Sequence, residues 1–471
     1  MVYLMVRIMD IIEWSSLDEA ARKACLKRPA QESEGSVHSI VKDIISNIRA
    51  RGDEALLEYS RTLDKCPDGQ LQLTEEEIAL ACERIDPELK QAIDDAWENI
   101  TLFHSAQKPN HVTVETVPGV VCQTATHPVE KVGLYVPGGS APLVSTALML
   151  GVPAQIAGCE EVVLTSPYPL SEGIIYAAVK CGITQIFKMG GAHAVAALAY
   201  GTQSVPKVHK IFGPGNQFVT MAKRLVSEDA EGAAIDMPAG PSEVLVIADQ
   251  TANADFVASD LLSQAEHGPD SQVVVVSDSR ELLERTSKAI DEQLAALPRR
   301  EITAVALSKS RMILTSSIDE CIAISNTYAP EHLIVQTADP HSLVGRLRNA
   351  GSIFLGAWTC ESMGDYASGT NHTLPTYGYA RTASALGTDD FRRRYTISCA
   401  TEQGLRNIGR TVEILANAEG LDAHRNAVTL RLNRIGRNEG EVAPACCSAA
   451  SSSEKSDSSA SVSSRCCGCA Q

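Results

Sequence analysis

The chain has 471 residues, of which 44% are apolar and 21% charged, and this is the composition of a soluble globular protein with about three domains. Its 41 Lys and Arg against 58 Asp and Glu give a formal net charge of −17, which argues against nucleic acid and anionic membranes as partners. No apolar run is long enough to cross a membrane. The cysteines outside the tail lack metal or disulfide spacing, so we expect a cytoplasmic protein.

The first quarter of the chain reads as helical. Apolar residues at helical spacing predict a helix over residues 37–48, and Gly52 separates it from a second helix. Sequence patterns typical of helices continue to about residue 102. No polar residues converge here in a way that indicates chemistry.

A pattern of alternating strands and helices begins at residue 131. We expect strands at residues 132–136, 161–165, 185–189 and 210–212, with helices between them, and therefore a parallel sheet. Three of these strands end in glycine turns, which favour phosphate and make a dinucleotide a reasonable ligand. The signal is weak, because Gly213-Pro-Gly215-Asn-Gln-Phe218 lacks the third glycine of Gly-x-Gly-x-x-Gly and glycine turns also simply close α/β loops.

A second alternating set predicts another parallel sheet. Its strands are expected at residues 243–248, 272–276, 331–336 and 352–355, and its helices at 254–266, 280–297 and 343–349. Two amphipathic helices follow between residues 405 and 432 and indicate an appended arm without strands. After Gly440 the Ser- and Cys-rich tail is too poor in large apolar residues to fold, and we expect it to be disordered.

The stretch 364–375 contains Asp365 and His372 on what reads as a loop after the strand at 352–355. Open α/β sheets bind ligands at the carboxyl ends of their strands, so this loop is a candidate site. An ordinary polar loop is the alternative.

Gln264 and His267 lie three residues apart near the end of a predicted helix, so their side chains share one face. An amide oxygen and an imidazole can ligate a divalent metal, and they can equally form a network that caps the helix. If a metal binds, the absence of cysteine favours Zn²⁺, Mn²⁺ or Co²⁺ in an open site.

Two further pairs contain a carboxylate and an imidazole. Glu331 and His332 are adjacent at a turn marked by Pro330 and could divide proton transfer between them, unless they form a solvated turn. Glu419 and His424 flank Gly420 in the arm, where packing of His424 against Leu421 and Val428 is the alternative.

The order and wording of the motifs closely resemble the L-histidinol dehydrogenase family from about residue 36 to 435. The resemblance rests on six blocks: Phe212-Gly-Pro-Gly-Asn216, Ile235-Asp-Met-Pro-Ala-Gly-Pro-Ser242-Glu-Val, Asp260-Leu-Leu-Ser-Gln264-Ala-Glu-His267-Gly, Tyr328-Ala-Pro-Glu331-His332-Leu, Gly364-Asp365-Tyr-Ala-Ser-Gly-Thr-Asn-His372-Thr-Leu-Pro and Glu419-Gly-Leu-Asp-Ala-His424-Arg-Asn-Ala-Val.

The resemblance implies a homodimeric zinc enzyme that oxidises L-histidinol to L-histidine through the aldehyde, with two NAD⁺. By motif, the implied zinc ligands are Gln264, His267, Asp365 and, from the partner subunit, His424; Glu331 and His332 are the acid/base pair. Implied substrate contacts are Ser242, His372 and Glu419, together with the ligands and His332; implied NAD contacts are Tyr135, His193 and Asn216. His193 stands where the family usually has glutamine, so we expect altered cofactor affinity.

The expected fold is α/β, with two Rossmann-like parallel-sheet domains, a helical N-terminal segment and a helical C-terminal dimerisation arm. The expected boundaries are 1–30 for the N-terminal segment, 31–131 plus 242–386 for the substrate and zinc domain, 132–241 for the NAD domain, 387–440 for the arm and 441–471 for the tail. Two rival functions are an aldehyde dehydrogenase that uses Cys122 or Cys159 as nucleophile and a homologue that binds metal or dinucleotide without catalysis.

Overall fold

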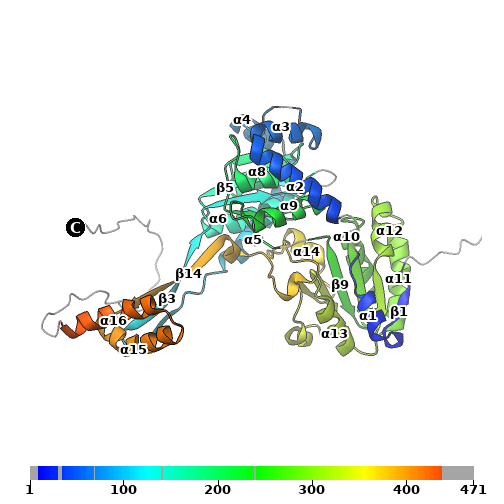
Figure 1. The fold of residues 1–471 in the computed structure, drawn as a ribbon. Helices are drawn as coiled ribbons and strands as arrows, with labels where there is room; N and C mark the ends of the chain where they lie inside the picture. Colours follow the sequence, from blue (N-terminus) through cyan, green and yellow to red (C-terminus); the bar gives the residue numbers. More distant parts are fainter. Residues whose placement is uncertain (1–8, 30–33, 68, 139–141, 238–239, 438–471) are drawn as a thin grey trace, which may run out of the picture. The chain divides into compact units, whose positions relative to one another are not determined.

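The computed structural model describes residues 9–29, 34–67, 69–138, 142–237 and 240–437 (Figure 1). The chain divides into two compact units. The first contains residues up to His111 and from Ala125 to Tyr395, and the second contains Val112–Thr124 and the residues from Thr396 onward. The expected disordered tail, residues 441–471, lies outside the described residues.

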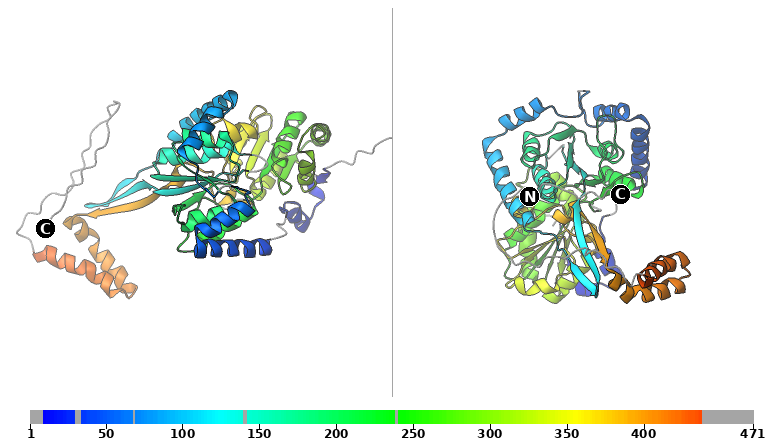
Figure 2. Two further views of the ribbon diagram at one scale, coloured as in Figure 1. Left: turned by 90° about the horizontal axis from the view of Figure 1, so that it is seen from above. Right: turned by 90° about the vertical axis from the view of Figure 1, so that its left-hand side faces the viewer.

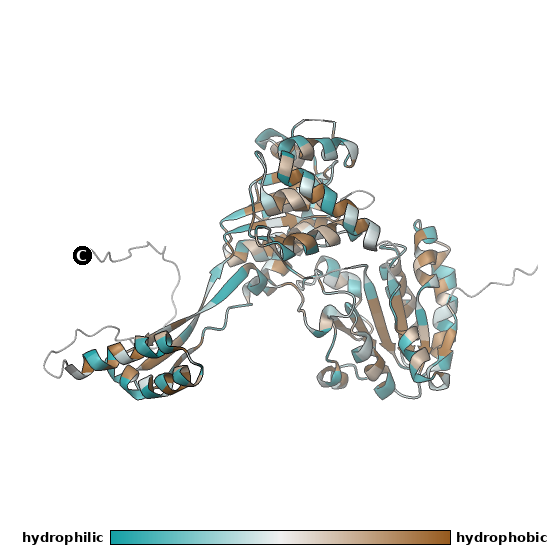
Figure 3. Cartoon of the chain, viewed as in Figure 1, coloured by the Kyte–Doolittle hydropathy of each residue, from teal (hydrophilic) through white to brown (hydrophobic). Residues whose placement is uncertain are grey.

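A six-stranded parallel sheet forms one half of the first unit. Its order is β1-β11-β10-β9-β12-β13. The central strands are buried on both faces, which explains their continuous apolar sequence and their brown colour in Figure 3. The strands are β1 (Ile11–Glu13), β9 (Glu243–Ala248), β10 (Gln272–Ser277), β11 (Arg311–Leu314), β12 (His332–Gln336) and β13 (Ser352–Leu355).

Helices cover both faces of this sheet. Residues of α10 (Ala254–Ala265), α11 (Arg280–Leu294) and α12 (Arg300–Ser308) pack on one face, and residues of α13 (Ile318–Tyr328) and the segment around α1 (Glu19–Cys25) on the other. The side chain of Asn253 accepts hydrogen bonds from the first backbone N–H groups of α10 and so fixes where that helix begins. A short helix, α14 (Glu361–Tyr366), follows β13.

A five-stranded parallel sheet, ordered β6-β5-β4-β7-β8, forms the other half of the first unit. One face packs against α4 to α7 and the other against α2, α3, α8 and α9, so the helices of residues 34–105 belong to the core of this sheet. The strands are β4 (Lys131–Tyr135), β5 (Glu161–Ser166), β6 (Gln185–Lys188), β7 (Lys210–Phe212) and β8 (Ala234–Ile235); the helices are α2 (Glu34–Arg51), α3 (Asp53–Thr62), α4 (Glu75–Arg84), α5 (Pro87–Ser105), α6 (Val144–Ala157), α7 (Glu172–Lys180), α8 (Gly191–Tyr200) and α9 (Gln217–Glu228).

The second unit combines strand and helix. A three-stranded sheet has the order β14-β3-β2, from β2 (Thr113–Val117), β3 (Val120–Pro128) and β14 (Arg392–Ala400). The end of β3 and the start of β14 belong to the first unit, and the rest of the sheet belongs to the second. Helices α15 (Glu402–Ala418) and α16 (Asp422–Arg437) lie side by side (Figure 2). The expectation of an arm without strands is therefore wrong.

The eight predicted strands of the two parallel sheets are confirmed within two residues. The helix expected at 343–349 is instead a 3-10 turn over His341–Arg346. No helix among the described residues combines the length and apolar character that a membrane crossing requires.

Candidate active site

The candidate residues gather at the amino ends of β9 and β12. His332 is the first residue of β12 and Glu243 the first residue of β9. Because helices between parallel strands run back against them, the carboxyl end of α10 brings Gln264 to the same edge. The expectation of a site at the carboxyl ends of this sheet is therefore wrong.

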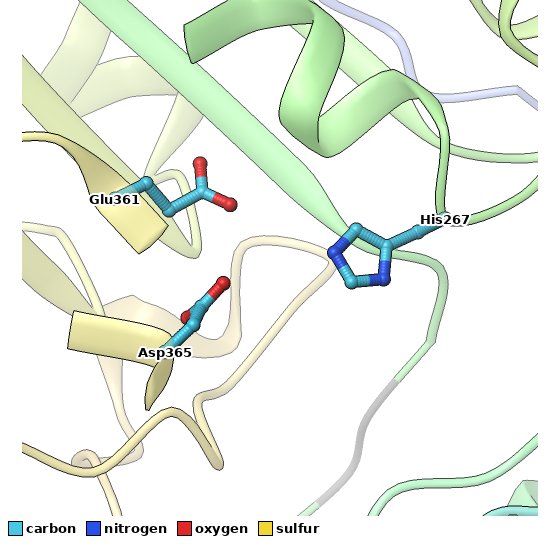
Figure 4. A group of neighbouring side chains, drawn as sticks. All are labelled: His267, Glu361 and Asp365. Atoms are coloured by element: carbon cyan, nitrogen blue, oxygen red, sulfur yellow. The ribbon is translucent and has the colours of Figure 1, made fainter. Parts of the chain in front are cut away.

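Three side chains at this edge form a group that could hold a metal ion. One ligand atom each of His267, Glu361 and Asp365 lies within 4.8 Å of the other two. In Figure 4, Glu361 and Asp365 extend from α14 toward His267, which follows α10. Asp365 thus lies in a short helix and not on the expected loop.

Sequence reasoning missed Glu361. It is 1% exposed, and it lies four residues before Asp365, which is the spacing that places two side chains on one face of a helix. That spacing is the available signal, but the sequence pattern predicts a loop from residue 364 onward and no helix for the residues just before it.

The side-chain amide of Gln264 is fully buried between the carboxylates of Glu361 and Glu331. With its nitrogen toward Glu361, the amide donates to that carboxylate and its oxygen accepts from Glu243 N–H at 3.1 Å and from His332 Nδ1 at 3.2 Å. With its oxygen toward Glu361, two oxygen atoms face each other. Either a cation between them or a proton on the Glu361 carboxyl would make that second orientation favourable.

Glu331 and His332 are both buried and lie against each other. Glu331 Oε2 accepts the Glu243 N–H at 2.8 Å and is 3.6 Å from His332 Nδ1. Burial raises the pKa of Glu331, and the neighbouring His332 offsets this only in part. A buried carboxyl whose pKa moves toward neutrality is suited to general acid/base work.

The opposite nitrogen of His332, Nε2, is 3.4 Å from Asp365 Oδ1. Burial alone would lower the pKa of His332, but the carboxylates of Glu361, Glu331 and Asp365 raise it well above its ordinary value. Burial raises the pKa of Glu361, whereas His332 lowers that of Asp365 against the effect of burial. The site therefore holds its negative charge unevenly, with Asp365 the more readily ionised carboxyl.

His372 and Ser242 lie close to the site in different ways. His372 uses both ring nitrogens within the protein: Nδ1 is 2.8 Å from the Asp365 carbonyl oxygen and Nε2 is 3.1 Å from Thr146 Oγ1. Burial lowers the pKa of His372. Ser242 is half-buried next to Glu243, and its carbonyl oxygen accepts the N–H of Gln272.

The three expected cofactor contacts follow strands β4, β6 and β7 of the five-stranded sheet. The Tyr135 hydroxyl accepts the Gly191 N–H at 3.1 Å and is 3% exposed. His193 is fully buried in the first turn of α8. Asn216 is exposed and caps α9 through its side-chain oxygen. Strand order reverses between β4 and β7, which is where open sheets of this kind bind ligands.

Glu419 and His424 belong to the second unit, at the end of α15 and in α16. Both are exposed. His424 is therefore free of the packed environment that was the alternative explanation for it.

The cysteines give no support to a thiol nucleophile. The nine cysteines among the described residues are free. Burial raises the pKa of Cys159 to about 11, and its Sγ contacts the Phe391 carbonyl oxygen. Cys122 contacts Ser398 within the second unit. Among the residues that the structure describes, neither thiol has a histidine or carboxylate as its hydrogen-bond partner.

The sequence profile of histidinol dehydrogenase matches residues 26–432. The chain belongs to the histidinol dehydrogenase family. Histidinol dehydrogenase of Photobacterium profundum is 55% identical over 431 residues, 92% of this chain and 97% of that protein. The Escherichia coli K12 protein is 56% identical over 425 residues, covering 90% and 98%. A crystal structure of the Elizabethkingia anophelis enzyme, 45% identical, covers 91% of this chain and 99% of its own with a TM-score of 0.88.

Family membership confirms the resemblance read from the motifs. It also disfavours the aldehyde dehydrogenase with a cysteine nucleophile. In this member of the histidinol dehydrogenase family, the first unit brings six of the predicted site residues together. They are Gln264, His267, Glu331, His332, Asp365 and His372.

Proposed function

We propose that the chain is an NAD-dependent oxidoreductase that converts L-histidinol to L-histidine through L-histidinaldehyde, using two NAD⁺, at the end of histidine biosynthesis. Beyond family membership, one observation supports this proposal most: a group of possible metal ligands lies beside the buried Glu331–His332 pair. One catalytic centre with a cation and a proton-transfer pair can serve both oxidations.

The residues present fit a zinc ion. Gln264, His267 and Asp365 supply neutral nitrogen and oxygen donors with one carboxylate, and His424 of the partner subunit completes the proposed set. The cluster formed by ligand atoms of His267, Glu361 and Asp365, all within 4.8 Å of one another, supports this fit, because imidazole nitrogen and carboxylate oxygen are donors that Zn²⁺ accepts. When bound, one zinc per subunit would hold the imidazole and amine of histidinol, and NAD⁺ would accept hydride.

Proton transfer falls to Glu331 and His332. In the first oxidation a base must remove the hydroxyl proton of the alcohol, and the imidazole of His332 lies next to the ligands that would hold the substrate. A cation among the carboxylates would offset the negative charge that raises the pKa of His332 and so allow it to accept that proton.

The second oxidation needs water on the aldehyde carbon. Glu331 is 3.6 Å from His332 and has a raised pKa, which suits a general base for that water. We assign Ser242, His372 and Glu419 to substrate contact or support.

We place NAD⁺ at the carboxyl ends of β4, β6 and β7, next to Tyr135, His193 and Asn216. Gly213 has a φ of +118°, and a Cβ there would lie 2.1 Å from the Tyr135 carbonyl oxygen. Only glycine allows this close approach of the two turns at the carboxyl ends of β4 and β7.

We propose a homodimer in which the second unit of one chain completes the site of the other. Large apolar side chains on this unit are exposed, as expected of a surface that a second copy covers; they are Val112, Val114, Ile397, Ile414, Leu415, Leu421 and Leu430. His424 and Glu419, also exposed on this unit, are available to a partner's site.

The ratio of NADH formed to histidinol consumed tests the proposal. A ratio of two supports the complete reaction, one indicates that the enzyme stops at the aldehyde, and no NADH supports the non-catalytic homologue. Removal of metal with a chelator should abolish activity and Zn²⁺ should restore it. Activity that persists without metal would contradict the metal assignment.

A further inference from the structure

Helix α6 contains a proline in its interior, and this proline leaves a carbonyl group free. In an α-helix each carbonyl oxygen accepts the N–H four residues later. The residue four after Met149 is Pro153, which has no N–H. The carbonyl oxygen of Met149 therefore lacks its usual donor and is available to another part of the chain.

Asn371 supplies the replacement donor. Its Nδ2 donates to the Met149 carbonyl oxygen at 2.7 Å, and its Oδ1 accepts the N–H of Thr373 at 2.9 Å. The same Nδ2 lies 3.4 Å from Nε2 of His104, whose Nδ1 bonds to the Ile100 carbonyl oxygen. The amide is 5% exposed and has a partner on both its oxygen and its nitrogen, so its orientation is fixed.

The next residue, His372, bonds to the same helix one turn earlier. Its Nδ1 faces the Asp365 carbonyl oxygen and must donate, so Nε2 is the acceptor and Thr146 Oγ1 the donor at 3.1 Å. Thr146 is fully buried, so its hydroxyl depends on partners within the protein.

Thr146 and Met149 are three residues apart on α6 and so lie on one face of the helix. They hold two consecutive residues, His372 and Asn371, and His372 in turn holds the backbone of Asp365. A continuous series of hydrogen bonds therefore leads from α6 to the residue whose carboxylate lies within 4.8 Å of ligand atoms of His267 and Glu361.

We propose that Thr146, Pro153 and Asn371 are positioning residues, which aim the Asp365 carboxylate at the metal by holding the 371–372 segment against α6. The proposal rests on the metal site proposed above. It assigns His372 a role in support of Asp365, since both its ring nitrogens are engaged within the protein. Helix α6 follows β4, whose carboxyl end we assign to NAD⁺, and it packs on the five-stranded sheet. Through Thr146 and Met149 it also bonds to residues 371–372, which follow the last strand of the six-stranded sheet.

Thr146→Val tests the proposal, because valine keeps the shape of threonine and removes the hydroxyl donor. Thr146→Ser keeps the donor and loses a methyl group. Thr303→Val is the matched control: Thr303 is also fully buried in a helix, and its hydroxyl bonds only to the Arg299 carbonyl oxygen. The readouts are the Zn²⁺ dissociation constant, measured by competition with a chelator, and kcat and KM for histidinol.

We expect Thr146→Val to weaken Zn²⁺ binding by about 10- to 100-fold, as loss of support for a metal ligand does. Thr146→Ser and Thr303→Val should bind Zn²⁺ like the wild type, whatever their effect on the melting temperature. If Thr146→Val had the same Zn²⁺ affinity and the same kcat as Thr303→Val, the proposal would be overturned.

Amide hydrogen exchange of the metal-free protein separates this proposal from the proposed metal site. Thr146→Val should speed exchange at residues 364–373 relative to Thr303→Val, even if the wild type binds no Zn²⁺. Unchanged exchange there would overturn the positioning role. A wild type that binds no Zn²⁺ but shows the exchange effect would instead contradict the metal site alone.

Discussion

His193 Nε2 lies 2.8 Å from Asp64 Oδ2, and both side chains are buried. The same carboxylate oxygen accepts the N–H of Gly190 at 2.9 Å, so one acid holds the histidine and the turn that opens α8. The imidazole is fully buried and stacks on Tyr59. His193 therefore supports the glycine turn indirectly, through the Asp64 carboxylate that bonds to both.

His193→Gln should change the KM for NAD⁺, because a flexible amide replaces a ring that Asp64 holds in place. Asp64→Asn should raise the KM further, by about tenfold, since it removes a charged acceptor from the turn. The measurement is the KM for NAD⁺ of each variant and of the wild type. Zn²⁺ content, measured alongside, should stay constant. Cofactor kinetics equal to wild type in both variants would remove this turn from the NAD⁺ site.

Glu331→Gln should impair oxidation of the aldehyde more than oxidation of the alcohol, because only the second step needs an activated water. The expected loss on supplied histidinaldehyde is about 10²-fold or more. Glu292→Gln is a control for the same substitution at an exposed position. Wild-type turnover of the aldehyde by Glu331→Gln would assign the water to another base.

The sequence identified the parallel sheets well because their strands are buried on both faces and are therefore continuously apolar. It did not reveal β14, which begins with three arginines and has no fully buried position, or β1, which is only three residues long. Such strands depend on pairing with distant partners, and pairing has no local signature.

The sequence predicts which residues form the candidate site better than it predicts where in the fold the site lies. Gln264, His332 and Asp365 do come together, but at the amino ends of β9 and β12. Strand order and the return of α10 determine that edge, and neither can be read from local sequence. The links from Thr146 and Asn371 could not be predicted for the same reason, since they join residues more than 200 positions apart.

Asp260→Asn should alter how stability depends on pH. Burial raises the pKa of Asp260 to about 7. Between the ordinary value near 4 and about 7 the folded protein holds a proton that the unfolded chain releases, so this group's contribution to stability falls as pH rises through that window. Asparagine can still accept the hydrogen bond from Gln336 Nε2 and does not ionise.

The measurement is the free energy of unfolding of the metal-free protein at pH 6 and pH 8. The stability of Asp260→Asn relative to wild type should be greater at pH 8 by about 1 kcal/mol. An equal difference at both pH values would mean that the carboxyl of Asp260 ionises alike in the folded and unfolded chain.

His267→Ala and His424→Ala should complement each other if His424 serves the partner's site. Each variant alone should be inactive. After unfolding and refolding together, random pairing makes half of the dimers mixed, and in each mixed dimer one site carries both substitutions and the other neither. About a quarter of all sites should then be intact. No recovery, beside a wild type that refolds, would mean that His424 serves its own chain.

The hydrogen bond from Asn371 to the Met149 carbonyl oxygen also leads to an evolutionary prediction. The Met149 carbonyl oxygen lacks a donor within the helix because Pro153 has no N–H, and Asn371 supplies that donor instead. The hydrogen bond therefore requires both residues. Across related sequences, these two positions should therefore change together although 218 residues separate them. A residue other than proline at position 153 would restore the N–H that bonds to the Met149 carbonyl oxygen within the helix. Selection for an amide at position 371 should then be weaker.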